Sequence, residues 1–470
     1  MVMQRRHLLG AASALSALPA PLWAQAQTQS PAFTAADLAH AERLRELALA
    51  DGEAWALVES LTTEVGARPA GSEGDRRAAA WALSAFTRLK LEAARAEPMN
   101  VRVWQRGAAI ARLTAPYAQP LVMAALGNSV AAPPGGIEAE LAYYPDLKTL
   151  SADTSERARG RIVFIDQSTE RTRDGSGYGR AVPMRITGAS EAAKRGALAV
   201  AIRSVGTSSN RIAHTGAMSY DIQQPRLPAF AVSVPDADLI ARLASRSTPL
   251  RMHFTLDARE GVDAITHNLI AEIKGSELPD EVVLIGAHLD SWDVGQGALD
   301  DGAGVAIVTA AAALIQRAGL RPKRTIRVVL FGNEENGFDG AHAYSERYAS
   351  VKHQLVGESD FGAARIWRFN HRVAPAALPL MAPMAAMLAP LGVAWAEAAR
   401  NEGNPGPDAA VLMRRHRWPA VALTQDGSAY FDVHHTENDT LDKVERAALP
   451  YNVACWAVVA WLAAQAPVAF

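Results

Sequence analysis

The chain of 470 residues contains a single cysteine, Cys455. One thiol cannot form a disulfide within the chain, so a covalent cross-link is excluded as a source of stability. Cys455 lies in the apolar run YNVACWAVVAWLAAQ, whose pattern favours a helix. We therefore expect a buried structural thiol at this position and not a nucleophile.

Neither sign of charge is in excess. Lysine and arginine number 47, aspartate and glutamate 49, and the formal net charge is -2. This balance lacks the basic excess of nucleic-acid-binding proteins, so we expect no nucleic-acid partner. A hydrophobic share of 49% is that of an ordinary globular protein, and 470 residues exceed what one hydrophobic core usually organises. Two domains are therefore expected.

The N-terminus has the composition of an export signal. Arg5 and Arg6 precede an apolar stretch that ends in an A-x-A cleavage pattern at residues 24–26. We predict a signal peptide over residues 1–26, of the twin-arginine type or, alternatively, of the general secretory type, and a periplasmic or secreted mature protein. No other uninterrupted apolar stretch reaches about 18 residues, so no membrane segment is expected in the mature form.

The hydrophobic pattern divides the rest of the chain into three regions. Residues 27–112 show apolar positions at helical spacing, notably at 35–60 and 72–91, and form the N-terminal part of a main domain. Residues 113–261 contain short strand-like runs separated by glycine, proline and serine, and this change of pattern predicts an inserted module. Residues 262–470 complete the main domain.

Within the predicted insert, the segment RTRDGSGYGRAVPMR at residues 171–185 is rich in glycine. It lacks the Lys-Ser/Thr ending and the strand-to-helix setting of a phosphate-binding loop. We expect a mobile surface loop there.

From residue 265 onward, strand and helix patterns alternate. The runs HNLIAEIKG, EVVLIGAHL and TIRVVLFGN predict strands, and GAGVAIVTAAAALIQRAG and GFDGAHAYSERYAS predict helices. This alternation is typical of an α/β domain with a mostly parallel, mixed sheet flanked by helices. Ligands bind to such sheets beyond the carboxyl ends of the strands.

Acidic residues and a histidine collect where the predicted strands end. His288 and Asp290 follow one strand, Glu334 and Glu335 follow a second, and Asp360 follows a third. Unpaired buried carboxylates cost several kcal/mol each, and divalent cations would supply the missing counter-charge. Because His288 and Asp290 face the same way on a strand, Asp290 could accept a hydrogen bond from an imidazole whose other nitrogen holds a metal.

The order of these residues resembles that of the co-catalytic dizinc exopeptidases. The motifs that carry the resemblance are H-x-D at 288–290, D-D-G at 300–302, E-E at 334–335, E-S-D at 358–360 and H-x-x-x-D-T at 435–440. The similarity runs from about residue 35 to the C-terminus. It implies the zinc exopeptidase fold, with residues 113–261 forming a cap similar to the protease-associated domain of that family.

The resemblance also implies two zinc ions per chain. His288 and Asp360 would bind one ion, Glu335 and His435 would bind the other, and Asp300 would bridge them. Each ion would then have three protein contacts and share a water, as a hydrolytic site requires.

Further roles follow from the same resemblance. Glu334 falls at the position of the general base, and Asp290 and Asp301 would support the ligands. The peptide bond between Asp300 and Asp301 is cis in relatives. His434 directly precedes the assigned ligand; we choose His435 because it keeps the family's gap before the D-T pair at 439–440.

The implied reaction is hydrolysis of short peptides, in particular dipeptides with free termini, with Glu334 moving the proton of a zinc-activated water. General aminopeptidase activity is the main alternative. A glutaminyl cyclase with one catalytic zinc and a non-catalytic binding protein of the same fold are the others, so the zinc content (two, one or none) would separate these classes. The resemblance further suggests a homodimer.

Overall fold

The computed structural model describes residues 32–246, 248–395 and 401–470. The predicted signal peptide at residues 1–26 lies outside the described residues.

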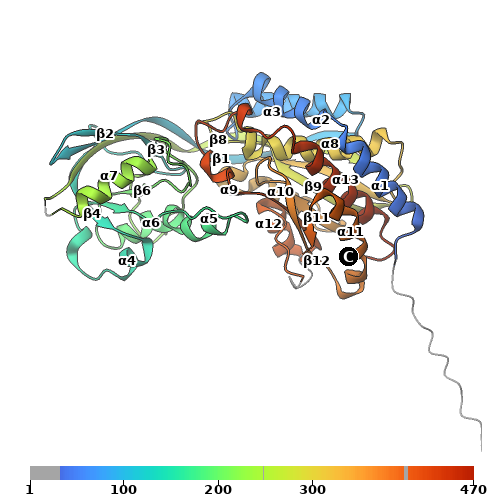
Figure 1. The fold of residues 1–470 in the computed structure, drawn as a ribbon. Coiled ribbons are helices and arrows are strands. Elements are labelled where there is room, and N and C mark those ends of the chain that lie inside the picture. Colours follow the sequence, from blue (N-terminus) through green and yellow to red (C-terminus); the bar gives the residue numbers. More distant parts are fainter. Residues whose placement is uncertain (1–31, 247, 396–400) are drawn as a thin grey trace, which may run out of the picture. The chain divides into compact units, whose positions relative to one another are not determined.

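A mixed sheet with helices on both faces forms the main part of the fold (Figure 1). Its strands, in spatial order, are β13 (Ala394–Trp395), β12 (Ile366–Arg372), β14 (Ala420–Gln425), β11 (Lys352–Glu358), β9 (Leu278–His288), β10 (Arg324–Phe331) and β8 (Arg251–Ile273). Strands β14, β11, β9 and β10 run parallel, whereas β8 is antiparallel to β10 and β12 is antiparallel to β14. The predicted α/β class with a mostly parallel, mixed sheet is confirmed.

Two cores cover the two faces of this sheet, because successive residues of a strand point to opposite faces. On β9, Val283 and Ile285 enter one core, and Val282 and Leu284 enter the other. The first core contains helices α8 (Ala303–Arg317) and α13 (Leu449–Gln465), and the second contains α10 (Asp339–Arg347) and α12 (Pro407–His416).

Helices α8 and α13 are apolar on nearly all sides because they are buried on nearly all sides. The stretch Ala298–Arg317 is long and apolar enough to cross a membrane, yet its whole apolar window is buried in this protein. It is therefore a core helix. Cys455 is buried within α13, which confirms the predicted structural thiol.

The N-terminal helices pack into the first core as well. They are α1 (Ala35–Leu49), α2 (Glu53–Ser60) and α3 (Glu73–Arg88), and the prediction of helices at 35–60 and 72–91 is confirmed. Thr34 and Asp37 form a capping box that fixes the start of α1, and Ser72 caps α3. Helix α11 (Met381–Leu388) packs against α13.

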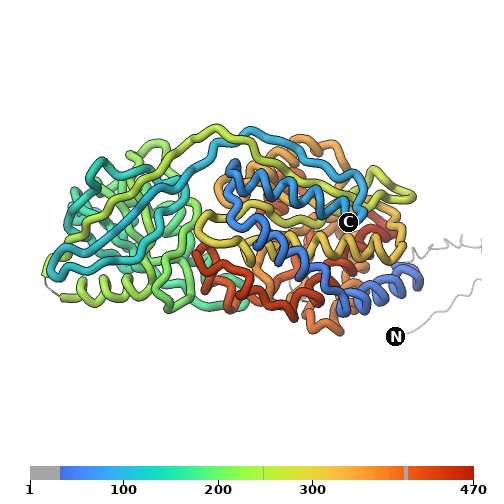
Figure 2. The backbone as a smooth tube through the Cα atoms, turned by 90° about the horizontal axis from the view of Figure 1, so that it is seen from above, coloured from blue at the N-terminus to red at the C-terminus, as the bar shows by residue number. Residues whose placement is uncertain are grey.

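Two long strands, β1 (Glu92–Ala115) and β8, lead from the main sheet to a second group of strands (Figure 2). They pair antiparallel along nearly their whole length, from Glu92 opposite Glu272 to Ala115 opposite Arg251. The strands beyond are β4 (Ile137–Tyr144), β5 (Ile162–Ile165), β6 (Ala199–Arg203), β7 (Ala229–Val232) and β3 (Met123–Ala125), in that spatial order, with β2 (Gln119–Leu121) beside β1. Helices α4 (Leu147–Ala152), α5 (Ser176–Ala181), α6 (Pro183–Ala193) and α7 (Val234–Ala244) accompany them.

The predicted limits of the insert, 113 and 261, fall inside these two continuous strands. A hydrophobic pattern cannot mark such a boundary, because the strands continue across it without a turn. That residues 113–261 form a separate domain stays a prediction.

The expectation of a mobile surface loop at residues 171–185 is wrong for most of its length, because α5 and the start of α6 occupy it. The glycines of this segment permit close packing. Gly175 adopts a positive φ of 73° at the start of α5, and a Cβ on Gly177 would collide with the backbone carbonyl of Glu170. Glycine enrichment therefore marks a tight helix start here and not a flexible loop.

A shortened chain tests whether the main sheet folds without the insert. Val103 and Val262 are paired across β1 and β8, so residues 104–261 can be replaced by a two-residue Asn-Gly turn that closes a hairpin. The buried residues of the two cores on the main sheet all lie outside the deleted range. We expect this variant to unfold in one cooperative thermal transition followed by circular dichroism. Non-cooperative melting or an insoluble product, with the full chain as control, would show that the two parts share one folding unit.

Candidate metal centre

Parallel strands bring three of the predicted site regions to one edge of the main sheet. His288 is the last residue of β9. Strand β10 ends opposite it and is followed by Glu334 and Glu335, which begin the short helix α9 (Glu334–Gly337). Strand β11 ends beside β9, two residues before Asp360. The carboxyl ends of parallel strands meet at one edge, so these side chains converge.

The turn Ala298–Gly302 brings Asp300 to the same edge, just before α8. The peptide bond between Asp300 and Asp301 is cis, as the resemblance implies. The carboxylate of Asp439 accepts hydrogen bonds from the backbone N–H of Leu299 at 2.7 Å and of Asp300 at 3.2 Å. Asp439 therefore fixes the turn that presents Asp300.

The two oxygens of the Asp300 carboxylate face different histidines. Oδ1 lies 3.1 Å from Nε2 of His288, and that nitrogen lies 3.7 Å from Oδ1 of Asp360. Oδ2 lies 3.3 Å from Nε2 of His435, and that nitrogen lies 3.2 Å from Oε2 of Glu335. The five residues predicted as metal ligands thus lie in two groups that share Asp300.

These groups have the chemistry of a divalent metal site. Oδ2 of Asp300 and Oε1 of Glu335 are buried and accept no hydrogen bond from the described residues. Burial, and next the charge of Asp300, raise the pKa of Glu335 to about 7, and burial raises the pKa of Glu334 well above its usual range. Such carboxylates cannot all be ionised without added positive charge. Carboxylates together with imidazoles are donors that suit a divalent cation, so the residues fit a metal centre.

Two adjacent histidines reach this centre. Nε2 of His435 contacts both Asp300 and Glu335, whereas Nε2 of His434 lies 3.5 Å from Oδ2 of Asp300 alone. The two rings stack with centroids 3.5 Å apart. The geometry favours His435 as the ligand of the Glu335 group, with His434 packed against it.

Asp290 supports the site in a way that differs from the prediction. Nδ1 of His288 lies 3.0 Å from the backbone carbonyl oxygen of Asp290 and 3.6 Å from its carboxylate. The expectation that the carboxylate accepts from the imidazole is therefore wrong, because it accepts from the backbone N–H groups of Glu334 at 3.0 Å and Glu335 at 3.3 Å. Asp290 joins the ends of β9 and β10. The carbonyl favours a proton on Nδ1 of His288, which leaves Nε2 able to bind a metal.

Asp301 faces away from the two groups. Its carboxylate accepts hydrogen bonds from the backbone N–H of His288 at 3.2 Å and of Gly304 at 3.1 Å. It thereby ties the end of β9 to the start of α8. That Asp301 supports the metal ligands stays a prediction.

Arg68, which the sequence did not single out, stabilises the segment that leads into the turn of Asp300. Its side chain is fully buried and donates to the carbonyls of Leu289 at 2.5 Å, Gln296 at 2.8 Å and Gly297 at 2.8 Å. It also donates to Gly66 at 3.2 Å. No pattern in the sequence distinguishes Arg68 from a surface arginine, since three of its four carbonyl partners, in Leu289, Gln296 and Gly297, lie more than 200 residues away.

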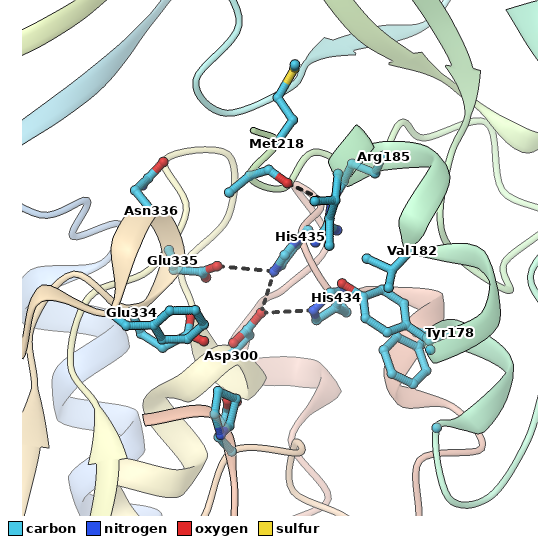
Figure 3. A pocket seen from close by; sticks show the side chains of 18 of the residues that line it. Tyr178, Val182, Arg185, Met218, Asp300, Glu334, Glu335, Asn336, His434 and His435 are labelled. Atoms are coloured by element: carbon cyan, nitrogen blue, oxygen red, sulfur yellow. Dashed lines mark hydrogen bonds and ion pairs between the residues drawn. The ribbon is translucent and has the colours of Figure 1, made fainter. Parts of the chain in front are cut away.

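A cavity of about 610 Å³ opens onto the metal centre. From the main domain it is lined by Asp300, Glu334, Glu335 and His435, and from the segments between β3 and β7 by Tyr178, Arg185 and Met218 (Figure 3). Tyr178 and Arg185 were not predicted because residues 171–185 were expected to form a surface loop. Pro183, the first residue of α6, was the available signal of a helix start.

Comparison with known proteins identifies the class. The model of peptidase family M28 matches residues 268–459. Carboxypeptidase Q of Mus musculus is 35% identical over 408 residues, which cover 86% of this chain and 84% of the mouse protein. The chain therefore belongs to peptidase family M28, and it is an exopeptidase.

Solved structures agree with this assignment. The crystal structure of a Peptidase M28 precursor from Shewanella amazonensis is 44% identical, has a TM-score of 0.89, and matches over 93% of this chain and 98% of that chain. A zinc aminopeptidase from Bacillus subtilis shares the fold, with a TM-score of 0.60 at 17% identity over 86% of this chain and 94% of that chain.

The role of Arg68 can be tested by stability. Arg68→Met leaves several buried carbonyl oxygens without their donor, and each such loss costs about 1–3 kcal/mol. We expect the free energy of unfolding to fall by at least about 3 kcal/mol in urea denaturation. Arg76→Met is the matched control, because Arg76 is exposed and pairs only with Glu73. Equal stability of the two variants would contradict the role given to Arg68.

Proposed function

We propose that the protein is an exported dizinc exopeptidase that hydrolyses short peptides, in particular dipeptides with free termini. The observation that carries the proposal is the position of Asp300, whose two carboxylate oxygens face two separate groups of donors. A carboxylate shared in this way suits a pair of cations.

The donor sets support zinc as the metal. His288, Asp300 and Asp360 would hold one ion. Asp300, Glu335 and His435 would hold the other. The Bacillus subtilis aminopeptidase of the same fold is a zinc enzyme by name. When bound, the two ions lower the pKa of a shared water and polarise the scissile carbonyl.

Glu334 is the proposed general base. It lines the cavity beside Glu335, and its backbone is fixed by the hydrogen bond to Asp290. A carboxylate oxygen of Glu334 takes a proton from the attacking water and delivers it to the nitrogen of the leaving amine. Once it has taken that proton, the neutral carboxyl group of Glu334 is the acid for the second transfer.

Substrate size follows from the cavity. The cavity of about 610 Å³ accommodates a short peptide. General aminopeptidase activity is the alternative, and the shared fold of the Bacillus subtilis aminopeptidase favours it. The similarity to carboxypeptidase Q over 86% of the chain favours the hydrolysis of dipeptides with free termini.

Three further parts of the proposal concern the whole protein. Residues 113–261 would act as a cap similar to a protease-associated domain, since they supply part of the cavity wall. Residues 1–26 would direct export to the periplasm or the exterior. The mature protein would form a homodimer without contacting membranes or nucleic acid.

A dipeptide library tests the substrate class. The zinc-loaded enzyme should hydrolyse free dipeptides faster than the same dipeptides blocked at the N-terminus or amidated at the C-terminus. Equal cleavage of amidated dipeptides and of longer peptides would favour the general aminopeptidase. Failure to cleave any of these substrates would contradict the proposal.

Separate roles for the two adjacent glutamates can be checked by conservative replacement. Glu334→Gln keeps the side-chain volume and removes the base, so both zinc ions should stay bound while kcat falls by about 10² to 10⁴. Glu335→Gln removes a proposed ligand and should lower the zinc content after dialysis. Zinc content by elemental analysis and turnover with zinc added back distinguish the two effects.

In this pair each variant is the control for the other. Excess zinc should partly restore Glu335→Gln and should not restore Glu334→Gln. If Glu334→Gln loses zinc, or keeps near-normal turnover, the assignment of base and ligand is wrong.

A further inference from the structure

Arg185 is a buried cation in the wall of the cavity. Arg185 lies in the first turn of α6, and 7% of its surface is exposed. It lines the cavity together with Val182 and Ile186. Among the described residues, no carboxylate lies within ion-pair distance of its guanidinium group. A buried guanidinium without a counter-charge costs several kcal/mol, so the position calls for an anion.

The neighbours of Arg185 orient its side chain without using all of its donors. Nε donates to the backbone carbonyl of Ala217 at 3.2 Å, and the guanidinium carbon lies 5.6 Å from the centre of the Tyr178 ring. Gly216 packs so closely that a Cβ at this position would collide with the guanidinium group. The side chain is therefore held in place, and beyond its contact with the side chain of Tyr178 it keeps N–H groups for another partner.

The contact with His435 does not satisfy these donors. Nη1 lies 3.4 Å from Nδ1 of His435, but the same Nδ1 lies 3.2 Å from the backbone carbonyl oxygen of Thr215. A ring that presents Nε2 to Glu335 and Asp300 carries its proton on Nδ1, and that proton is donated to Thr215. Nδ1 then cannot accept a hydrogen bond from Arg185.

The location of the guanidinium group defines what it could bind. It lies one imidazole ring beyond the proposed metal centre, since Nε2 of His435 is 3.2 Å from Glu335 and Nδ1 is 3.4 Å from Arg185 (Figure 3). One residue of peptide spans about 3.5 Å. A group that reaches Arg185 is therefore about one residue beyond a scissile bond at the metal centre.

We infer that Arg185 binds the terminal carboxylate of the substrate and so selects peptides with a single residue after the scissile bond. This inference rests on the proposed peptidase function and deepens it. A planar guanidinium with two free N–H groups binds a carboxylate through paired hydrogen bonds. The carboxylates of the metal centre are offset by the proposed zinc ions, so they do not compete for Arg185. A longer peptide would place an uncharged amide at this position and leave Arg185 unpaired.

The test compares a dipeptide with its C-amidated form. Zinc-loaded wild-type enzyme should show a kcat/KM for Ala-Ala about 10² or more above that for Ala-Ala-amide, because only the acid pairs with Arg185. In Arg185→Met this ratio should fall to near one, with the zinc content unchanged. Arg185→Lys should recover part of the ratio, since it restores the charge but not the paired geometry.

Arg180→Met is the matched control. Arg180 is an exposed arginine of α5 that pairs with Glu170, and its replacement should leave the wild-type ratio unchanged. Thermal unfolding of each variant monitors folding.

The outcomes separate this inference from the proposed function. If the wild type cleaves the acid and the amide equally well, or if Arg185→Met loses the same factor on both substrates, Arg185 does not bind the carboxylate, although the protein remains a peptidase. If the zinc-loaded wild type cleaves neither substrate, the proposed function fails and the assignment of Arg185 fails with it.

Discussion

Asp300 has to serve two groups of buried side chains with one carboxylate, and the rest of the site is arranged around that requirement. Its two oxygens face His288 on one side and His435 on the other. Burial, and next the charge of Asp300, raises the pKa of Glu335 to about 7, so added positive charge favours its ionised form at neutral pH. The carboxylates and imidazoles around Asp300 are suited to bind cations that supply this charge. A metal centre of this kind is the physical basis of hydrolysis in an M28 exopeptidase.

Backbone hydrogen bonds fix Asp300 from several directions. Asp439 accepts from the turn that carries it, Asp301 ties that turn to the end of β9, and Arg68 donates to the carbonyls that precede it. Asp290 does the same for the two glutamates after β10. These charged side chains bond to backbone groups and thereby position the predicted metal ligands that face the cavity. The ligands are therefore in place before a metal ion binds.

The sequence predicted the parts of the fold that depend on regular patterns. Strand and helix periodicity gave the α/β class, and the strand ends gave His288, Glu334, Glu335 and Asp360, since parallel strands must end at a common edge. The continuous strands β1 and β8 obscured the limits of the insert.

The contributions of Arg68 and Arg185 could not be predicted, because both depend on contacts between segments far apart in the chain. Arg68 bonds to carbonyls more than 200 residues away, and Arg185 meets His435 across 250 positions. Glycine enrichment around Arg185 was misleading as well, since the glycines allow close packing of α5 and not mobility.

We propose that two metal ions bind this centre, one at each oxygen of Asp300. A crystal of the zinc-loaded protein, with diffraction data collected on both sides of the zinc absorption edge, locates each ion directly. We predict two anomalous peaks, one between His288 and Asp360 and the other between Glu335 and His435, with Asp300 between them. A single peak, or two peaks that do not share Asp300, would contradict this proposal.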